Sequence, residues 1–212
     1  MNPTTTTTAG TTGPTQTTGS GDPERAEFNA CQWLIDRHLR DGRGDRVAVR
    51  CEGESHTYSD IHAEVRRAAS GLRALGVRPE ERVAMVMLDS VEFVATFLGG
   101  LRVGAVPVLV NPLLPPRDLA ATVADSRARV RVISQERAAG LEELLAGAPE
   151  VQAVVTTAAP DPASDPPTIA WADFTGHDDD SALHPTWAES PGFWLCTSGT
   201  TGRPKLAMHR HG

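Results

Sequence analysis

The sequence is poor in lysine and in long apolar runs, and each shortage excludes a class of protein. Lys205 is the only lysine among 20 basic residues and the net charge is −7, so no basic face for a nucleic acid or an anionic membrane is evident. No apolar run reaches the roughly 18 residues that would span a bilayer. Residues 1–22 lack the basic start and apolar centre of a secretory signal. We therefore expect a cytoplasmic protein without nucleic-acid or membrane partners.

Cysteine is also scarce, and its spacing indicates neither a disulfide framework nor a metal site. Cys31, Cys51 and Cys196 are widely separated and odd in number. This pattern suits reduced thiols in a cytosolic protein. Cys196 lies in an apolar stretch, where a core thiol is a better interpretation than a nucleophile. The sequence predicts no metal site.

Composition divides the chain into a tail and one domain. Residues 1–22 are almost all Thr, Gly, Pro and Ser; they cannot bury a core, so we expect a disordered tail. Residues 23–212 are expected to form one domain. Within it, residues 157–191 carry several prolines and the run Asp178–Asp180. We expect an exposed acidic, proline-rich connector, because three adjacent aspartates do not face one point and suit a solvated loop.

The rest of the domain alternates between helical and strand patterns. Helices are predicted at residues 27–40, 116–126 and 136–146, and also from Ser59 to Gly76 and from Ser90 to Gly104, with the two serines as N-caps. Strands are predicted at residues 47–49, 83–88, 105–110, 130–133 and 151–155. The core strands are apolar throughout, which is typical of a parallel sheet covered by helices on both faces. The sequence thus predicts an α/β fold with a mostly parallel sheet.

The residues richest in chemistry run from Thr197 to Lys205, with the sequence Thr-Ser-Gly-Thr-Thr-Gly-Arg-Pro-Lys. Gly199 and Gly202 can adopt backbone angles closed to other residues, so the peptide can curl and point successive N–H groups at one centre. Such a concavity binds anions, and Lys205 adds a mobile point charge. We interpret this segment as a polyphosphate-binding loop.

Two other interpretations of the loop fit the residues less well. The common P-loop places Ser or Thr after its lysine and opens onto a helix, whereas here Leu206 follows and Pro204 disfavours helix at Arg203. The apolar residues 193–196 and 206–208 instead predict a strand on each side. A plain Gly/Thr surface turn is the second alternative, and the length and order of the pattern argue against it.

The loop resembles the signature loop of the adenylate-forming (AMP-binding) superfamily, which includes acyl- and aryl-CoA ligases, peptide-synthetase adenylation domains and luciferases. Leu206 departs from the glycine usual at that position. The likeness covers roughly residues 27–212 and includes Thr57–Ile61, Gly76–Ala84, Gly104–Val108 and Asn111-Pro112. It implies the N-terminal part of the large domain of an adenylate-forming enzyme.

Within the superfamily, the chain is similar to the benzoate-CoA ligase group. The similar segments are Phe28–Ala30, Arg43–Asp45, Asn111–Leu114, Asp125–Val130 and the run from Gly202 to Lys205 that leads to His209 and His211. This likeness implies an aryl, benzoate-like carboxylic acid as the substrate.

The resemblance implies a reaction and a set of site residues. The acid would be activated by ATP with Mg²⁺ to an acyl-adenylate and then transferred to coenzyme A. The residues implied to hold the ATP phosphates are Thr197, Ser198, Gly199, Thr200, Thr201, Gly202 and Lys205. His209 and His211 would share a face of a strand and are candidates for the edge of the substrate pocket, with a structural role at the strand end as the alternative. No catalytic residue is implied within this chain.

In the family, the adenine pocket, the ribose-binding aspartate, the magnesium motif and a C-terminal domain with a catalytic lysine follow the part matched here. We therefore expect the 212 residues to be an N-terminal fragment that lacks a C-terminal half and does not turn over alone. Two other interpretations stay open: a peptide-synthetase-type adenylation domain, and a non-enzymatic remnant that binds nucleotide weakly or pairs with a partner.

Overall fold

The structure is a computed structural model that describes residues 26–137, 150–161, 163–166, 168–197 and 205–212. The tail expected at residues 1–22 and nearly all of the helix expected at 136–146 lie outside the described residues. So do residues 198–204 of the loop. Among the residues described, no helix combines the length and apolar character needed to cross a bilayer.

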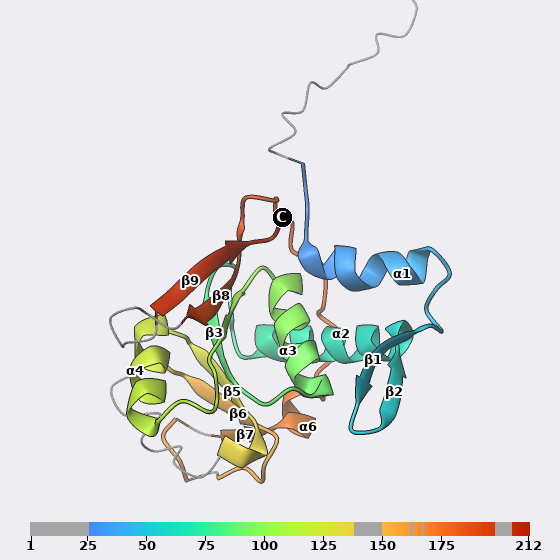
Figure 1. The fold of residues 1–212 in the computed structure, drawn as a ribbon. Helices are drawn as coiled ribbons and strands as arrows, with labels where there is room; N and C mark the ends of the chain where they lie inside the picture. Colours follow the sequence, from blue (N-terminus) through green and yellow to red (C-terminus); the bar gives the residue numbers. More distant parts are fainter. Residues whose placement is uncertain (1–25, 138–149, 162, 167, 198–204) are drawn as a thin grey trace, which may run out of the picture.

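A seven-stranded sheet forms the centre of the molecule, in the order β7-β6-β5-β3-β4-β8-β9 (Figure 1). Each neighbouring pair is parallel except β8 and β9, which are antiparallel. The strands are β3 (Arg82–Val86), β4 (Val106–Leu109), β5 (Val130–Ile133), β6 (Ala153–Thr156), β7 (Thr168–Ala170), β8 (Pro191–Thr197) and β9 (Lys205–Arg210). The predicted mostly parallel sheet is confirmed, with the ends of its core strands shifted by a residue or two.

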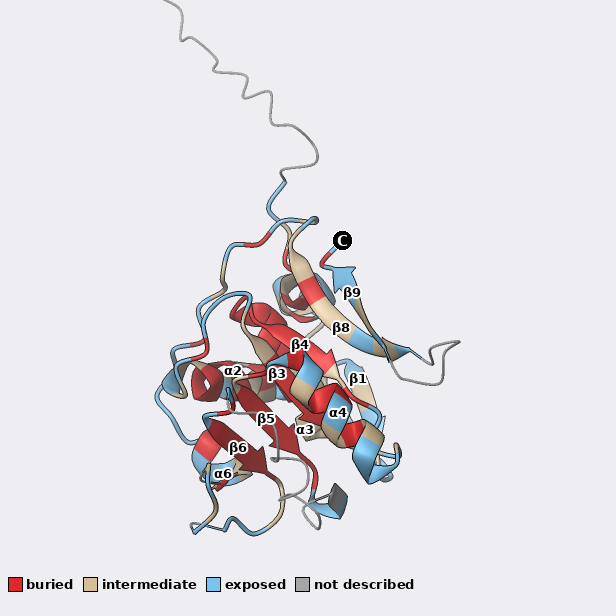
Figure 2. Ribbon diagram, turned by 90° about the vertical axis from the view of Figure 1, so that its left-hand side faces the viewer, coloured by how far each residue is buried: buried red, intermediate tan, exposed pale blue. Residues whose placement is uncertain are grey.

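Helices cover both faces of this sheet, because alternate residues of each buried strand point to opposite sides. Val83 and Met85 of β3 pack in one cluster with residues of α2 (Tyr58–Ala74) and α3 (Val91–Arg102). Ala84 and Val86 of the same strand pack in another cluster with residues of α4 (Pro116–Ser126). Figure 2 shows the buried strands between these helices. The mainly apolar strands that predicted this arrangement are accordingly buried on both faces, and the arginine within β5, Arg131, is buried with them.

The N-terminal part lies beside the sheet and carries its own small sheet. The helix predicted at 27–40 begins at Ala30 and contains a π-helical stretch, Gln32–Asp36, followed by α1 (Arg37–Arg40). The hairpin of β1 (Val47–Cys51) and β2 (Glu54–Thr57) follows and leads directly into α2.

The N-cap of α2 differs from the prediction. Thr57, not Ser59, caps the helix: its side chain accepts from the backbone N–H of Asp60, and the Asp60 carboxylate accepts from the N–H of Thr57. Ser59 was the wrong choice because the Thr-x-x-Asp spacing lets the two side chains cap reciprocally. The cap predicted at Ser90 is confirmed, since its side chain accepts from the N–H of Phe93.

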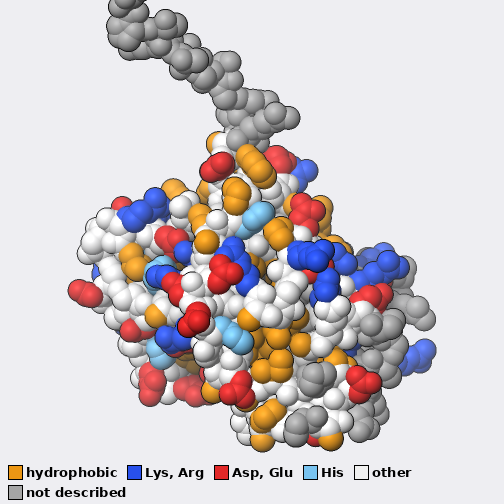
Figure 3. Space-filling view, turned by 180° about the vertical axis from the view of Figure 1, so that it is seen from behind, with side chains coloured by type: hydrophobic (Ala, Val, Ile, Leu, Met, Phe, Trp, Pro, Cys, Tyr) orange, Lys and Arg blue, Asp and Glu red, His pale blue; other side chains and the backbone are white. Residues whose placement is uncertain are grey.

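The connector at residues 157–191 is not exposed throughout, and that expectation was wrong. It contains β7 at the edge of the sheet and α6 (Trp171–Phe174), whose Phe174 is fully buried against Gly71 of α2. The Ser181 and Thr186 side chains are buried as well. The acidic run signalled solvent exposure, but its carboxylates are used in ion pairs: Asp179 with Arg66 and Asp180 with Arg73, both on α2. Acidic and basic side chains accordingly lie side by side on this face (Figure 3).

One further contact fixes the connector to the start of the domain. Arg102, at the end of α3, is nearly buried; its guanidinium donates to the Ser181 carbonyl and pairs with Asp36 at 2.8 Å. Asn29 donates to the carbonyls of Leu101 and His184. These contacts join the N-terminal helix, α3 and the connector into one body. The remaining short element is a 3-10 turn at Gln135–Arg137.

Candidate functional site

The candidate loop joins the last two strands of the sheet. β8 and β9 pair antiparallel with Thr197 opposite Lys205, and the Thr197 hydroxyl donates to the Lys205 carbonyl at 3.3 Å. The prediction of a strand on each side of the loop is therefore confirmed, and a strand-to-helix P-loop is excluded at this place. Ser198, Gly199, Thr200, Thr201 and Gly202 lie outside the described residues, so their role in binding phosphate stays a prediction.

Two aromatic contacts fix the hairpin of β8 and β9 to the core. The Phe193 ring meets the Phe97 ring of α3 edge-on, with centroids 5.3 Å apart, and stacks on His209 of β9 at 4.7 Å and 7°. On the other face of the sheet, Trp194 and Leu206 pack against the cluster under α4. Because β8 is parallel to β4, its carboxyl end points to the same edge as the carboxyl ends of the buried strands. The hairpin thus presents Lys205, which is exposed, at that edge.

The structure gives His209 and His211 different surroundings. His209 is an exposed residue of β9 that stacks on Phe193. His211 follows the end of β9 and is buried, and its Nδ1 accepts the backbone N–H of Ala30 at 3.1 Å. Burial lowers the pKa of His211 below its ordinary value. His211 therefore fastens the end of β9 to the N-terminal helix, while a place for either residue at the edge of a substrate pocket stays a prediction.

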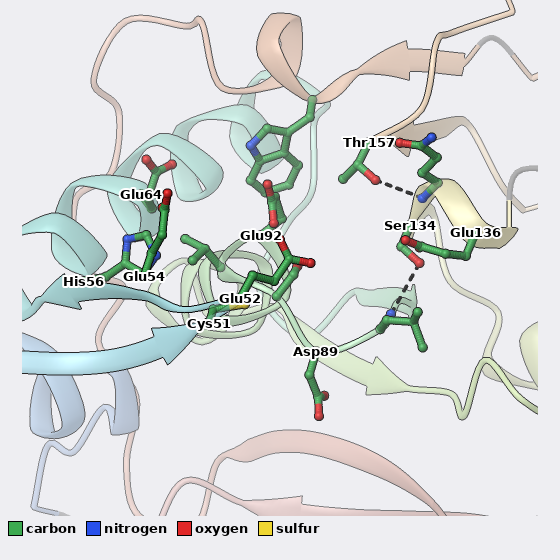
Figure 4. Close-up of a pocket in the computed structure, with 15 residues that line it drawn as sticks. Cys51, Glu52, Glu54, His56, Glu64, Asp89, Glu92, Ser134, Glu136 and Thr157 are labelled. Carbon is green, nitrogen blue, oxygen red and sulfur yellow. Dashed lines mark hydrogen bonds between the residues drawn. The ribbon is translucent and has the colours of Figure 1, made fainter.

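A cleft of about 640 Å³ opens at the carboxyl ends of β3, β5 and β6, from which Asp89, Ser134 and Thr157 follow (Figure 4). Ser134 accepts from the N–H of Leu88 at 3.3 Å, and Thr157 from the N–H of Gln135 at 2.9 Å, which ties the strand ends together. The cleft lies where the chain order reverses between β3 and β5, which is where open α/β sheets commonly bind ligands. No local pattern in the sequence predicted this cleft, because its lining residues come from six separate segments.

The charges in this cleft oppose phosphate binding. Among the described residues that line it there are six carboxylates and neither Lys nor Arg; the carboxylates belong to Glu52, Glu54, Glu64, Asp89, Glu92 and Glu136. An anion placed there would be repelled from several sides. Among the described residues, no group of three His, Cys, Asp or Glu is placed to hold a metal ion. Of the two features at this edge, the hairpin is the one suited to a polyphosphate.

The three cysteines are free thiols, and burial makes two of them, Cys31 and Cys196, poor nucleophiles. Cys31 is fully buried, and burial followed by the charge of Asp36 raises its pKa to about 12. Cys196 is half-buried in β8, and burial raises its pKa as well.

Comparison with known proteins shows the family to which this chain belongs. Residues 36–212 match the model of the AMP-binding enzyme family. The chain belongs to the AMP-binding enzyme family. Within that family it is 37% identical to the 3-hydroxybenzoate–CoA ligase of Aromatoleum sp. (strain CIB) over 186 residues, and 36% identical to the benzoate–CoA ligase of Thauera aromatica over 190 residues. These matches cover 87% and 89% of this chain and 35% of each relative.

Solved structures of AMP-binding enzymes share the fold. An anthranilate CoA ligase in complex with anthranoyl-AMP aligns with a TM-score of 0.79 at 28% identity, and a benzoate CoA ligase from Burkholderia xenovorans LB400 with a TM-score of 0.72 at 31% identity. Each alignment covers 87% of this chain and 35% of the other. The chain therefore spans about a third of the length of the aryl-CoA ligases that it matches.

Proposed function

We propose that this chain supplies the ATP-phosphate-binding part of an AMP-forming ligase that activates a benzoate-like acid and transfers it to coenzyme A. The observation that carries the proposal is the β8–β9 hairpin, which presents the chain's only lysine at the carboxyl edge of the sheet. Membership in the AMP-binding family supports ATP as the ligand. The aryl-CoA ligases among the relatives support an aromatic acid and coenzyme A as the other reactants.

The proposal assigns roles to the hairpin residues. The pairing of Thr197 with Lys205 closes the base of the loop, so backbone N–H groups and the hydroxyls of Ser198, Thr200 and Thr201 would surround the ATP phosphates. The ammonium of Lys205 would offset charge that develops as pyrophosphate leaves, an electrostatic role that needs fixed positioning. Mg²⁺ would arrive bound to the ATP.

The first test measures ATP binding to the 212-residue chain by calorimetry, beside the Lys205→Ala variant. We expect Lys205→Ala to weaken ATP binding by tenfold or more, since about 1.4 kcal/mol corresponds to tenfold and a charged hydrogen bond contributes about 1.5–3 kcal/mol. Arg210→Ala is the matched control, because it removes a positive charge from the far end of the same strand, where Arg210 pairs with Glu189. Equal ATP affinity for Lys205→Ala and the unaltered chain would refute the role of the loop.

The second test examines catalysis in a chimera. This chain replaces the matching first third of the Thauera aromatica benzoate–CoA ligase, and benzoate-dependent release of AMP is measured. The 212 residues alone are expected to give no ATP–pyrophosphate exchange with benzoate, whereas the chimera is expected to be active and Lys205→Ala to reduce its kcat. Robust exchange by the 212 residues alone would show that the reaction does not need the remaining two-thirds of the relatives' length.

A further inference from the structure

The segment after the π-helix carries a charge opposite to that of the protein as a whole. Residues 37–50 contain five arginines, Arg37, Arg40, Arg43, Arg46 and Arg50, and only two acids, Asp41 and Asp45, so they carry +3 while the net charge is −7. The segment runs from α1 through the following loop into β1. Figure 1 places α1 and the ends of β8 and β9 at Thr197 and Lys205 on opposite sides of the molecule.

Backbone contacts join two of these arginines to one histidine, and a third, Arg37, precedes that histidine in α1. The N–H of Arg43 donates to the carbonyl of His38 at 2.8 Å, and the N–H of Arg46 donates to the carbonyl of Arg43 at 3.2 Å. The loop is fixed to the start of α2, where the N–H of Tyr58 donates to the carbonyl of Arg46. The His38 ring stacks on the Tyr58 ring at 3.9 Å and 17°. The imidazole therefore has a fixed place beside the loop.

The positive charges of this cluster are only partly offset. Arg43 pairs with Asp41, but Arg37 and Arg46 make no ion pair with any described residue. The Arg37 guanidinium instead lies over the Trp33 ring at 3.9 Å, which positions it without neutralising it. The pKa of His38 lies below its ordinary value, because partial burial and the charges of Arg43, Arg37 and Arg46 disfavour its protonation. The carboxylate of Asp41 acts on the pKa of His38 in the opposite direction.

We propose that Arg37, His38, Arg43 and Arg46 form an anion-binding site for a phosphate group. Guanidinium groups present planar N–H forks that match phosphate oxygens, and an imidazole becomes a further donor when protonated. The Nε atoms of Arg37 and Arg43 and the Nδ1 atom of His38 are buried without a hydrogen-bond partner among the described residues. A bound phosphate would neutralise their mutual repulsion and favour the imidazolium form of His38. The site is separate from the loop at residues 197–205 and stands whether or not that loop binds ATP.

The test uses the 212-residue chain with Lys205→Ala, which removes the proposed phosphate contact of the loop. The imidazole of His38 is titrated by NMR in sodium chloride and in inorganic phosphate at equal ionic strength, so that screening is the same in both. We expect phosphate to raise the pKa of His38, with His62 and His211 as internal references for the fold. Phenyl phosphate is a second probe: an effect at least as large as that of inorganic phosphate indicates a phosphate monoester as the ligand, and an effect of inorganic phosphate alone indicates the free anion.

Two matched triple variants distinguish the effect of the cluster on phosphate binding from the effect of net charge. Arg37→Gln/Arg43→Gln/Arg46→Gln is expected to weaken phosphate binding tenfold or more. The control, Arg40→Gln/Arg50→Gln/Arg117→Gln, removes the same charge from exposed positions that do not act on His38, and it should bind phosphate within about twofold of the parent chain. An equal loss of binding in both variants, or no difference in the pKa of His38 between chloride and phosphate, overturns the proposal.

Discussion

The contact between α6 and α2 gives the sharpest prediction for stability, because one glycine makes it possible. A β-carbon at Gly71 would lie 2.2 Å from the Phe174 carbonyl oxygen and 2.6 Å from two carbons of its ring. Contacts this short cannot be relieved by turning a side chain, since the nearest atom is backbone. The Gly71→Ala substitution must therefore push α6 away from α2 or leave α2 distorted.

The size of the effect follows from two opposed terms. Alanine in a helix interior is favoured over glycine by about 1 kcal/mol, while overpacking costs about 1–3 kcal/mol and more where backbone must move. We expect a net loss of about 2 kcal/mol in the free energy of unfolding. With a urea m-value of about 2 kcal/mol/M, the midpoint would fall by about 1 M.

Tryptophan fluorescence during urea unfolding measures this loss directly, because the Trp171 ring lies 5.4 Å from that of Phe174. Gly99→Ala is the control: it also replaces a helical glycine, but its β-carbon would meet its neighbours only at 3.0–3.2 Å. We expect a clearly smaller loss there. A Gly71→Ala chain as stable as the parent would refute the packing of the connector on α2.

Three further predictions concern the cap, a buried thiol and a buried imidazole. Thr57→Ala should cost about 1 kcal/mol of stability in thermal unfolding, whereas Ser59→Ala should cost almost nothing; the reverse result would restore Ser59 as the N-cap. Cys31, with its pKa raised to about 12, should resist a thiol reagent at pH 8 until the chain unfolds, and labelling in the native state would contradict its burial. Since burial lowers the pKa of His211, the unfolded state binds its proton more tightly. Stability should therefore be constant above pH about 7 and fall as the pH drops below the unfolded pKa of about 6.5. His211→Gln should flatten this dependence, and an unchanged slope would assign it to another group.

The sheet could be predicted from the sequence because its core strands are mainly apolar on both faces, Arg131 excepted, and separated by helical periods. The connector could not, because its prolines and Asp178–Asp180 resemble a solvated loop. What overrides that pattern is tertiary: Arg66, Arg73 and Arg102 are distant in sequence, and only the fold brings them to the connector. The sequence shows that the aspartates can form ion pairs, but it does not show where their arginine partners lie in the fold.

The candidate site, like the fold, was only partly predictable from the sequence. Local signals identified the loop: glycine spacing, hydroxyls and a lone lysine all lie within nine consecutive residues, from Thr197 to Lys205. No local signal could predict that His211 would turn inward to accept the N–H of Ala30, because its period with His209 holds only while the strand continues, and β9 ends at Arg210. The alternation of side chains along a strand predicted that His209 and His211 share a face. They do not, because His211 lies beyond the end of β9.

The parallel topology also explains how one edge of the sheet can discriminate between parts of a ligand. The carboxyl ends of all the parallel strands meet at this edge, with the acidic cleft at β3, β5 and β6 and Lys205 at the hairpin beyond β4. A polyphosphate approaching the edge would be repelled at the β3–β5 end and attracted at the β8–β9 end. Four of the six carboxylates are exposed, so each would repel a phosphate 4 Å away by only about 1 kcal/mol in water, and the bias would come from their sum. On the proposed function, the cleft's carboxylates would therefore act without touching ATP, by confining its phosphates to the hairpin.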